Sequence, residues 1–417
     1  MIAYHFPPLQ GSTGVHRTVA FAKYLQLYGW EVTILTAHPR AYPEINQQNS
    51  EAVPPHVRVE RAFALDAQRH LSIFGRYPSM LARPDRWRSW ITGGAIAGAR
   101  IVRSWRPDAI MSTYPIASAH VIAARLHRKF GLPWVADLRD PMAQENYPPD
   151  PKTKQAFFRI EEDIVRHAAR MTVTTEGTAA LYRDRYPQYR SDAIVVIPNG
   201  FDEQAFANID VARASKPQRK LRLLHSGLLY PRERNPTDFF AAVAELKREG
   251  VLRAEDVEFA FRGSGNEGDY SERLARLQVD DLIRLLPAIP YAEALAEMNA
   301  ADACMLFQAS NCNQQIPAKV YEYLYCGKPI LALTDPVGDT GQLLADLDVG
   351  PVVPLDDKQK IKAALPAYIA ALREGRVTTA ARERVNRYSR RSLTQELAQL
   401  LDQVVERRAE RPSVRSA

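Results

Sequence analysis

Short apolar runs alternate with segments of helical apolar spacing through the first 200 residues. The apolar runs predict buried strands at residues 2–6, 30–37, 109–112, 133–140, 171–176 and 193–197. The helical spacing predicts helices at residues 18–28, 117–130, 157–169 and 177–186. The first of these strands is short for a buried one, so we expect either that the natural chain starts upstream or that the strand is truncated.

The pattern lapses into polar, irregular sequence at residues 204–220, which we interpret as a linker, and then resumes. Strands are predicted within residues 221–229, 257–265, 282–286, 301–307 and 330–333, and helices at residues 236–249, 270–277, 291–299 and 396–408. Alternating strands and helices imply parallel sheets with helices on both faces. We therefore predict an α/β protein with two Rossmann-like, doubly wound domains. The first comprises residues 1–200 with a C-terminal helix at about residues 388–408, the second comprises residues 201–387, and residues 409–417 form a disordered tail.

Length and composition agree with this division. A chain of 417 residues is too long for one typical core, and its 46% hydrophobic and 25% charged content is that of a soluble globular protein. The sequence shows neither a membrane-spanning apolar window nor a signal peptide. Three cysteines without metal-ligand spacing indicate a reducing, cytoplasmic location. The net charge of +7 favours anionic partners, whether phosphates, nucleic acid or lipid headgroups.

The most informative stretch is residues 314–333, QQIPAKVYEYLYCGKPILAL, which reads as a loop, a helix and a strand. Pro317 can open the helix and Gly327 can end it in the left-handed conformation. Lys319 and Glu322 lie one turn apart near the helix N-terminus, where a phosphorylated, hydroxyl-bearing ligand can bind. The alternative is a surface ion pair on an amphipathic helix.

The segment PAKVYEYLYCGKPILAL resembles the donor-site helix of retaining, GT-B-fold glycosyltransferases of family four, of the bacterial polysaccharide-assembly type. The resemblance implies two Rossmann-like domains that face each other across a cleft, with the final helix crossing back to the first domain. It implies that Glu322 holds the ribose hydroxyls of a nucleotide sugar. The family often carries a second glutamate eight residues upstream, in contact with the transferred sugar, where this chain has Gln314.

Two loops of the second half are similar to the family's diphosphate and nucleotide loops. Gly227, Arg232 and Arg234 follow a predicted strand, and either arginine can take the place of the family's basic residue on the diphosphate. Arg262, Gly263 and Gly265 follow the next strand, where the family carries a similar G-x-G loop. The alternatives are a solvated turn with paired charges and a plain tight turn.

Three features of the first half are assigned to the candidate site. The GSTGVHR segment contributes Gly11, Gly14 and Arg17 before a helix, and otherwise forms a plain strand-to-helix turn. Asp137, Arg139 and Asp140 crowd the end of a buried strand and resemble an acceptor-side motif. Arg139 can meet a phosphate or carboxylate and Asp140 can orient an acceptor hydroxyl, unless the charges form a structural pair. His120 lies near a family histidine that contacts the donor sugar, or is a structural helical histidine.

A separate basic, aromatic segment spans residues 76–107. It interleaves seven arginines with Trp87, Trp90 and Trp105, a combination that favours peripheral contact with an anionic membrane at its cytoplasmic face. A core-facing aromatic helix is the alternative, and no nucleic-acid motif accompanies the segment.

We therefore predict transfer of a sugar, with retention, from a UDP- or GDP-type donor to a saccharide or lipid-linked acceptor. Arg232, Arg234 and Lys319 would neutralise the leaving diphosphate without a metal cofactor, since the chain lacks a clear D-x-D motif. Two other classes stay open: a nucleotide-sugar epimerase or hydrolase, and a non-catalytic binding protein that keeps the fold.

Overall fold

The chain divides into two compact units. The computed structural model describes residues 1–10, 14–145, 147–207, 209 and 220–409. Unit 1 contains Met1–Pro198 together with the last helix, and unit 2 is Asn199–Ser389. Most of the predicted linker and the tail residues 410–417 lie outside the described residues.

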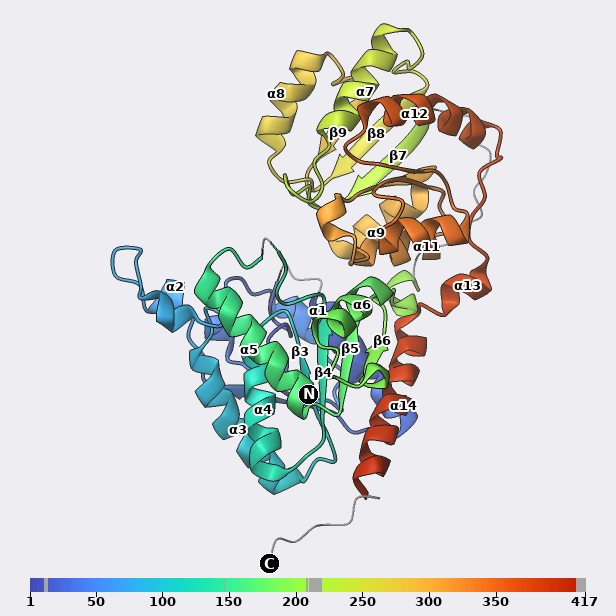
Figure 1. The fold of residues 1–417 in the computed structure, drawn as a ribbon. Helices are drawn as coiled ribbons and strands as arrows, with labels where there is room; N and C mark the ends of the chain where they lie inside the picture. Colours follow the sequence, from blue (N-terminus) through green and yellow to red (C-terminus); the bar gives the residue numbers. More distant parts are fainter. Residues whose placement is uncertain (11–13, 146, 208, 210–219, 410–417) are drawn as a thin grey trace, which may run out of the picture. The chain divides into compact units, whose positions relative to one another are not determined.

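Unit 1 is built on a parallel sheet (Figure 1). Its strands are β1 (Thr33–Ala37), β2 (Arg58–Ala62), β3 (Ile110–Thr113), β4 (Trp134–Arg139), β5 (Arg170–Val173) and β6 (Ile194–Val196). β1 pairs with β2, and β3 to β6 pair in chain order. Ile2 joins these two groups, because it forms parallel bridges with both Leu35 and Ser112. The predicted strand at residues 2–6 is thus reduced to bridges at one residue, since the chain turns away at Pro7 and Pro8.

Helices cover both faces of this sheet. They are α1 (Gly14–Tyr24), α2 (Ala67–His70), α3 (Ser89–Trp105), α4 (Ser118–Phe130), α5 (Pro151–His167), α6 (Glu176–Arg185) and α14 (Arg390–Ala409). Successive strand residues point to opposite faces. Trp134 therefore packs in the core with α3, α4 and α5, whereas Val135 packs against Leu397 and Leu401 of α14. The C-terminal helix thus completes the core of unit 1.

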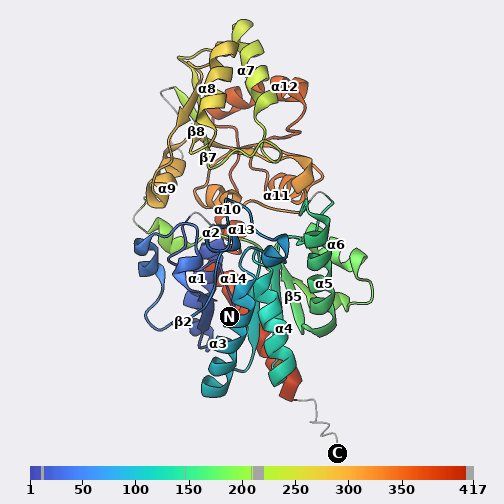
Figure 2. The same cartoon turned by 90° about the vertical axis from the view of Figure 1, so that its left-hand side faces the viewer.

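Unit 2 repeats the architecture around a six-stranded parallel sheet in the order β12, β11, β10, β7, β8, β9 (Figure 2). The strands are β7 (Leu221–Ser226), β8 (Val257–Arg262), β9 (Ile283–Leu286), β10 (Ala303–Phe307), β11 (Ile330–Leu333) and β12 (Val352–Val353). The helices are α7 (Thr237–Arg248), α8 (Glu267–Leu277), α9 (Tyr291–Ala300), α10 (Ala318–Tyr325), α11 (Asp339–Leu347), α12 (Lys358–Arg373) and α13 (Arg382–Asn386). The predicted α/β fold with two Rossmann-like halves is confirmed.

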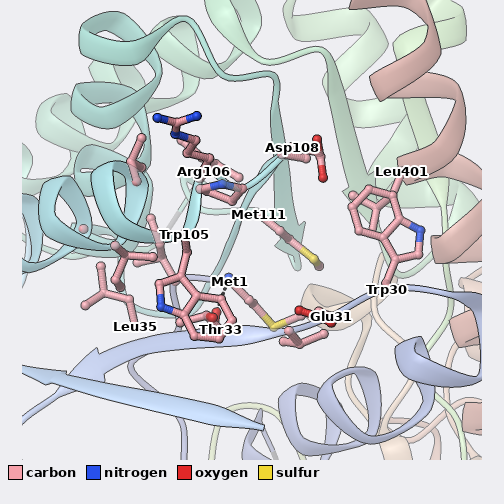
Figure 3. A pocket seen from close by; sticks show the side chains of 18 of the residues that line it. Met1, Trp30, Glu31, Thr33, Leu35, Trp105, Arg106, Asp108, Met111 and Leu401 are labelled. Carbon is pink, nitrogen blue, oxygen red and sulfur yellow. Dashed lines mark hydrogen bonds between the residues drawn. The ribbon is translucent and has the colours of Figure 1, made fainter. Parts of the chain in front are cut away.

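A pocket of about 400 Å³ lies in unit 1 at the amino ends of β1 and β3 (Figure 3). Trp30, Trp105 and Leu401 line it, and the Met1 ammonium donates a hydrogen bond of 2.7 Å to the Thr33 carbonyl there. Ligands of parallel α/β sheets bind at the carboxyl ends of the strands. This pocket is therefore separate from the candidate site.

The predicted basic, aromatic surface at residues 76–107 does not form a single interface. Trp90 is fully buried, and Trp87 packs against the core while its indole N–H donates to the Ala41 carbonyl. Trp105 is half-exposed and lies under Arg58 at the far end of α3. Because α3 has 17 residues, its two ends are about 25 Å apart. Within the described residues, no helix is long and apolar enough to cross a membrane.

Candidate functional site

Lys319 in the first turn of α10 forms the centre of the site in unit 2. Its ammonium lies 3.4 Å from His225 Nε2 at the end of β7. The His225 Nδ1–H donates to the Met305 carbonyl at 3.0 Å, which leaves Nε2 as an acceptor for the lysine. Gly227 has a φ of +106°, and a Cβ at this position would lie 3.0 Å from the Lys319 ammonium. The backbone conformation therefore favours glycine, and a larger residue would also displace the Lys319 ammonium.

The surroundings of Lys319 disfavour a charged ammonium. Burial of the ammonium and the nearby Arg234 hold the pKa of Lys319 well below its ordinary value. Burial and the facing Lys319 likewise keep the pKa of His225 well below its usual range, so the imidazole is neutral. An anion at this position would relieve the repulsion between Lys319 and Arg234. The arrangement therefore favours a phosphate.

Glu322, one turn further along α10, is buried and faces α9. Its Oε1 accepts a hydrogen bond of 2.7 Å from the Tyr291 hydroxyl at the start of α9. Tyr291 keeps 38% of its surface exposed, whereas Glu322 keeps 8%. The tyrosine thus orients a carboxylate at the edge of the site. Sequence reasoning missed Tyr291 as a residue of the site.

The glycine loop after β8 packs beside this centre. Gly263 and Gly265 both adopt positive φ, and a Cβ on Gly265 would lie 3.1 Å from Leu228, next to Gly227. Arg262 forms a bidentate pair with Glu297 at 2.7 and 2.8 Å and donates to the Pro287 carbonyl at 2.7 Å. The Arg262 N–H groups therefore hold the segment after β9, and the predicted contact of Arg262 with the donor stays a prediction.

The remaining predicted donor-side residues lie on the loops before α7 and α10. Arg234 donates to the Leu228 carbonyl at 3.1 Å and stacks on Tyr230, whereas the Arg232 side chain is exposed. Of the two arginines, it is Arg234 whose charge acts on Lys319. Pro317 is the N-cap residue of α10, and Gln314 lies half-buried in the preceding loop.

Asp137 and Arg17 form an internal pair in unit 1. Asp137 accepts two hydrogen bonds from Arg17, at 3.1 and 3.3 Å, and one each from Thr113 and Thr172 at 2.8 Å. Although burial opposes ionisation, Arg17 keeps the pKa of Asp137 below its ordinary value. Arg17 also donates to the carbonyls of residues 197 and 198. Asp137 and Arg17, both predicted on the acceptor side, thus hold α1 against β4, and their predicted contact with an acceptor stays a prediction.

Arg139 and Asp140 are better placed for a ligand. Arg139 adopts a φ of +60° at an irregularity in the β4–β5 pairing. One of its terminal nitrogens donates to the Tyr114 carbonyl at 3.2 Å, while its buried Nε has no hydrogen-bond partner among the described residues. Burial raises the pKa of the half-buried Asp140 although Arg139 acts in the opposite direction. Burial, together with Arg139, lowers the pKa of His5 to about 3, which adds a neutral imidazole that sequence reasoning missed.

His120 is a core residue, and its predicted contact with the donor sugar stays a prediction. The ring is fully buried, and its Nδ1 lies 2.8 Å from Ser112 Oγ. Burial lowers its pKa to about 4. Gly14 is the buried first residue of α1, and Gly11 lies outside the described residues.

No group of three or more histidine, cysteine, aspartate or glutamate side chains among the described residues is arranged to hold a metal ion.

Comparison with known proteins agrees with the fold. The family described as "Glycosyl transferase 4-like domain" matches residues 13–200, and the family "Glycosyl transferases group 1" matches residues 220–370. Together they account for most of the chain, which belongs to this glycosyltransferase family of the GT-B type. No curated protein sequence matches the chain.

Several solved structures share the fold over nearly their whole length. Sucrose-phosphate synthase from Thermosynechococcus elongatus is 17% identical, with a TM-score of 0.64 over 97% of this chain and 99% of that one. A glycosyltransferase from Rickettsia africae ESF-5 is 13% identical, with a TM-score of 0.66 over 97% and 98%. HepE from Anabaena, solved with UDP-glucose, is 14% identical, with a TM-score of 0.59 over 98% of each chain. The protein is therefore a GT-B glycosyltransferase by family and by fold.

Proposed function

We propose that this glycosyltransferase binds a nucleoside-diphosphate sugar in unit 2 and transfers the sugar, with retention, to a hydroxyl acceptor in unit 1. The observation that carries the proposal is the Lys319 ammonium beside Gly227, with the oriented Glu322 carboxylate one turn away. A cation and a helix N-terminus suit a diphosphate, and a carboxylate suits ribose hydroxyls. The UDP-glucose complex of the structurally similar HepE supports a UDP-type donor.

In the proposed reaction the bond between the anomeric carbon and the β-phosphate oxygen breaks. The acceptor oxygen bonds to the same face of the sugar, and its proton passes to the departing phosphate oxygen. The diphosphate gains negative charge as it leaves, so fixed cations lower the barrier. Lys319 and Arg234 supply that charge, and the exposed Arg232 is available to join them when the donor binds.

On the acceptor side we propose that Arg139 binds a phosphate or carboxylate and that Asp140 orients the attacking hydroxyl. The buried, incompletely partnered Arg139 side chain supports an anionic group. Together with the net charge of +7, this favours a lipid-linked or polysaccharide intermediate and peripheral contact with an anionic membrane on the cytoplasmic side.

A thermal-shift panel of nucleotide sugars tests donor binding. A donor at 100 times its Kd should add about 2.7 kcal/mol of stability. Glu322→Ala should abolish the shift, while the exchange of an exposed glutamate on the same unit, Glu272→Ala, should leave it unchanged. A panel in which no nucleotide sugar shifts the melting temperature would overturn the donor-site assignment.

The second candidate is a fold-keeping binding protein, favoured by Gln314 at the position of the family's sugar-contacting glutamate. Incubation of the protein with a binding donor and an acceptor extract distinguishes the two. Sugar transfer that Glu322→Ala removes supports the transferase. Binding without turnover, which Gln314→Glu does not change, supports the binding protein, and donor turnover without acceptor indicates a hydrolase or epimerase.

A further inference from the structure

Residues 71–82, here called the projecting loop, follow α2 and extend away from the helices of unit 1 (Figure 1). Ile73 and Arg76 exchange two backbone hydrogen bonds, at 2.8 and 3.0 Å, at the tip. Phe74 and Gly75 between them have φ values of +49° and +74°. Two central residues with positive φ define a type I′ turn, which normally contains asparagine and glycine.

The apolar side chains of the projecting loop point away from the core. Phe74 is 100% exposed, Ile73 is 74% exposed and Met80 is 59% exposed. A phenylalanine in the left-handed conformation is uncommon, and here no burial offsets that cost. These side chains therefore contribute nothing to the core of unit 1 and are available for contact outside the chain.

The surroundings of the projecting loop are strongly basic. Residues 67–106 contain eight arginines and a single acidic residue, Asp85, whose carboxylate accepts hydrogen bonds from the Ser118 backbone and hydroxyl. The resulting net charge of this segment equals the net charge of +7 of the whole chain. Arg76 at the tip and Arg88 at the start of α3 are both exposed. An exposed apolar tip between cations matches the boundary between headgroups and acyl chains of an anionic bilayer.

We propose that the projecting loop inserts Ile73 and Phe74 into the headgroup boundary of an anionic membrane, with Arg76 and Arg88 on the lipid phosphates. This proposal rests on the proposed membrane contact and moves it from the tryptophans of α3 to a loop that precedes them. Nucleic acid is a poorer partner, because of the three exposed apolar side chains only Phe74 can stack on a base, whereas the acyl boundary of a membrane accommodates Phe74, Ile73 and Met80 alike.

Tryptophan placed at the tip reports insertion directly. Phe74→Trp should become quenched when the full chain is mixed with phosphatidylglycerol vesicles that carry brominated acyl chains. Val337→Trp is the matched control, because Val337 is 72% exposed but belongs to unit 2. Subtraction of the wild-type signal removes the five natural tryptophans. Equal quenching at both positions, or none at residue 74, would overturn the proposal.

Vesicle sedimentation separates insertion from simple charge attraction. Phe74→Asp should weaken binding to phosphatidylglycerol vesicles at least about tenfold, and Arg76→Gln about fivefold, whereas Val337→Asp should leave it unchanged. Binding that Phe74→Asp does not alter would contradict insertion, as would self-association of the protein through the loop in place of vesicle binding. A thermal shift with nucleotide sugar, measured without vesicles, tests the donor site independently, so either result can fail alone.

Discussion

The surroundings of the Lys319 ammonium oppose its charge, because it is buried and Arg234 is close by. Its contact with His225 and the charge of Glu322 offset this only in part. A lysine whose pKa is lowered on folding makes the ligand-free protein less stable at neutral pH than an apolar side chain would. The same unbalanced charge is what a diphosphate would neutralise. The charge of Lys319 therefore lowers the stability of the ligand-free protein and at the same time favours binding of a diphosphate.

Lys319→Met should separate these two effects. We expect the apparent melting temperature of the ligand-free protein to stay equal or to rise, because methionine keeps the length of the side chain without the buried charge. The rate of sugar transfer should fall by about 10²-fold or more, since one fixed charge on the leaving group is lost. Lys152→Met, which exchanges an exposed lysine of α5, is the control. A variant that melts lower and still turns over normally would show that Lys319 is a structural residue.

His120 gives the protein an acid-sensitive core. Its pKa lies at about 4 in the folded chain, against 6.5 as its ordinary value. Below pH 6.5 the unfolded chain binds a proton that the folded chain does not, so stability falls as the pH drops from about 6.5 to about 4. The difference corresponds to at most on the order of 3 kcal/mol. Above pH 6.5 the ionisation of this histidine no longer changes the stability.

Chemical denaturation at several pH values measures this loss. His120→Asn can keep a hydrogen bond to Ser112 but does not titrate, so its stability should depend less on pH between 6.5 and 4. His56→Asn exchanges an exposed histidine as the control. His5, whose pKa is about 3, adds a similar dependence in both proteins. Identical pH profiles for wild type and His120→Asn would contradict the assignment.

At the scale of elements, a buried carboxylate fixes the loop that carries Asp140. Glu161 of α5 accepts hydrogen bonds from the Ala143 backbone N–H at 3.0 Å, from the hydroxyls of Tyr182 and Tyr186, and from Arg185 at 2.8 Å. Tyr182 in turn accepts from the backbone N–H of residue 142. α5, α6 and the segment after β4 are therefore joined through one side chain.

Glu161→Gln should lower the free energy of unfolding by about 3 kcal/mol, because the amide cannot accept all four hydrogen bonds and leaves Arg185 without its charge partner. Denaturant unfolding followed by tryptophan fluorescence checks this value. Glu162→Gln, on the exposed side of the same helix, should change it by less than about 0.5 kcal/mol. Comparable losses for the two variants would argue against the network.

Helices and strands were predictable from the sequence where a single local pattern of apolar residues determined the element. The run 330–333 is β11 with the predicted bounds, because four consecutive apolar residues are buried there. β2 at Arg58–Ala62 was not predicted, since an edge strand with partly exposed, charged residues has no apolar signature. α12 was also missed, and it contains Pro366 without ending.

The same distinction applies to the site. Glu322 was found because its helix motif resembles a family pattern, whereas its partner Tyr291 comes from another helix and a sequence offers no sign of that contact. Asp137 and Arg17 are 120 residues apart, so their pairing could not be read from local charge spacing. Tertiary contacts decide which charged residues are paired within the protein and which are open to a ligand.

For the whole molecule, unit 1 depends on both ends of the chain. Leu397 of α14 is fully buried against Phe21, Val135 and Ile197. Leu397→Ala should reduce the stability of unit 1 by about 3 kcal/mol. All five tryptophans belong to unit 1, so their fluorescence reports its unfolding selectively. Leu224→Ala, buried in unit 2, should shift this signal less, and an equal shift would show that the units unfold together.

The concentration of charge in residues 67–106 leaves the rest of the chain close to electrically neutral. Unit 1 therefore carries its positive charge unevenly, with the largest excess in one segment. A molecule of this kind is turned by the field of a negative surface before it makes contact, and this alignment weakens as salt shortens the Debye length to about 8 Å. The rate of productive encounters should accordingly respond to ionic strength more steeply than the chemistry that follows.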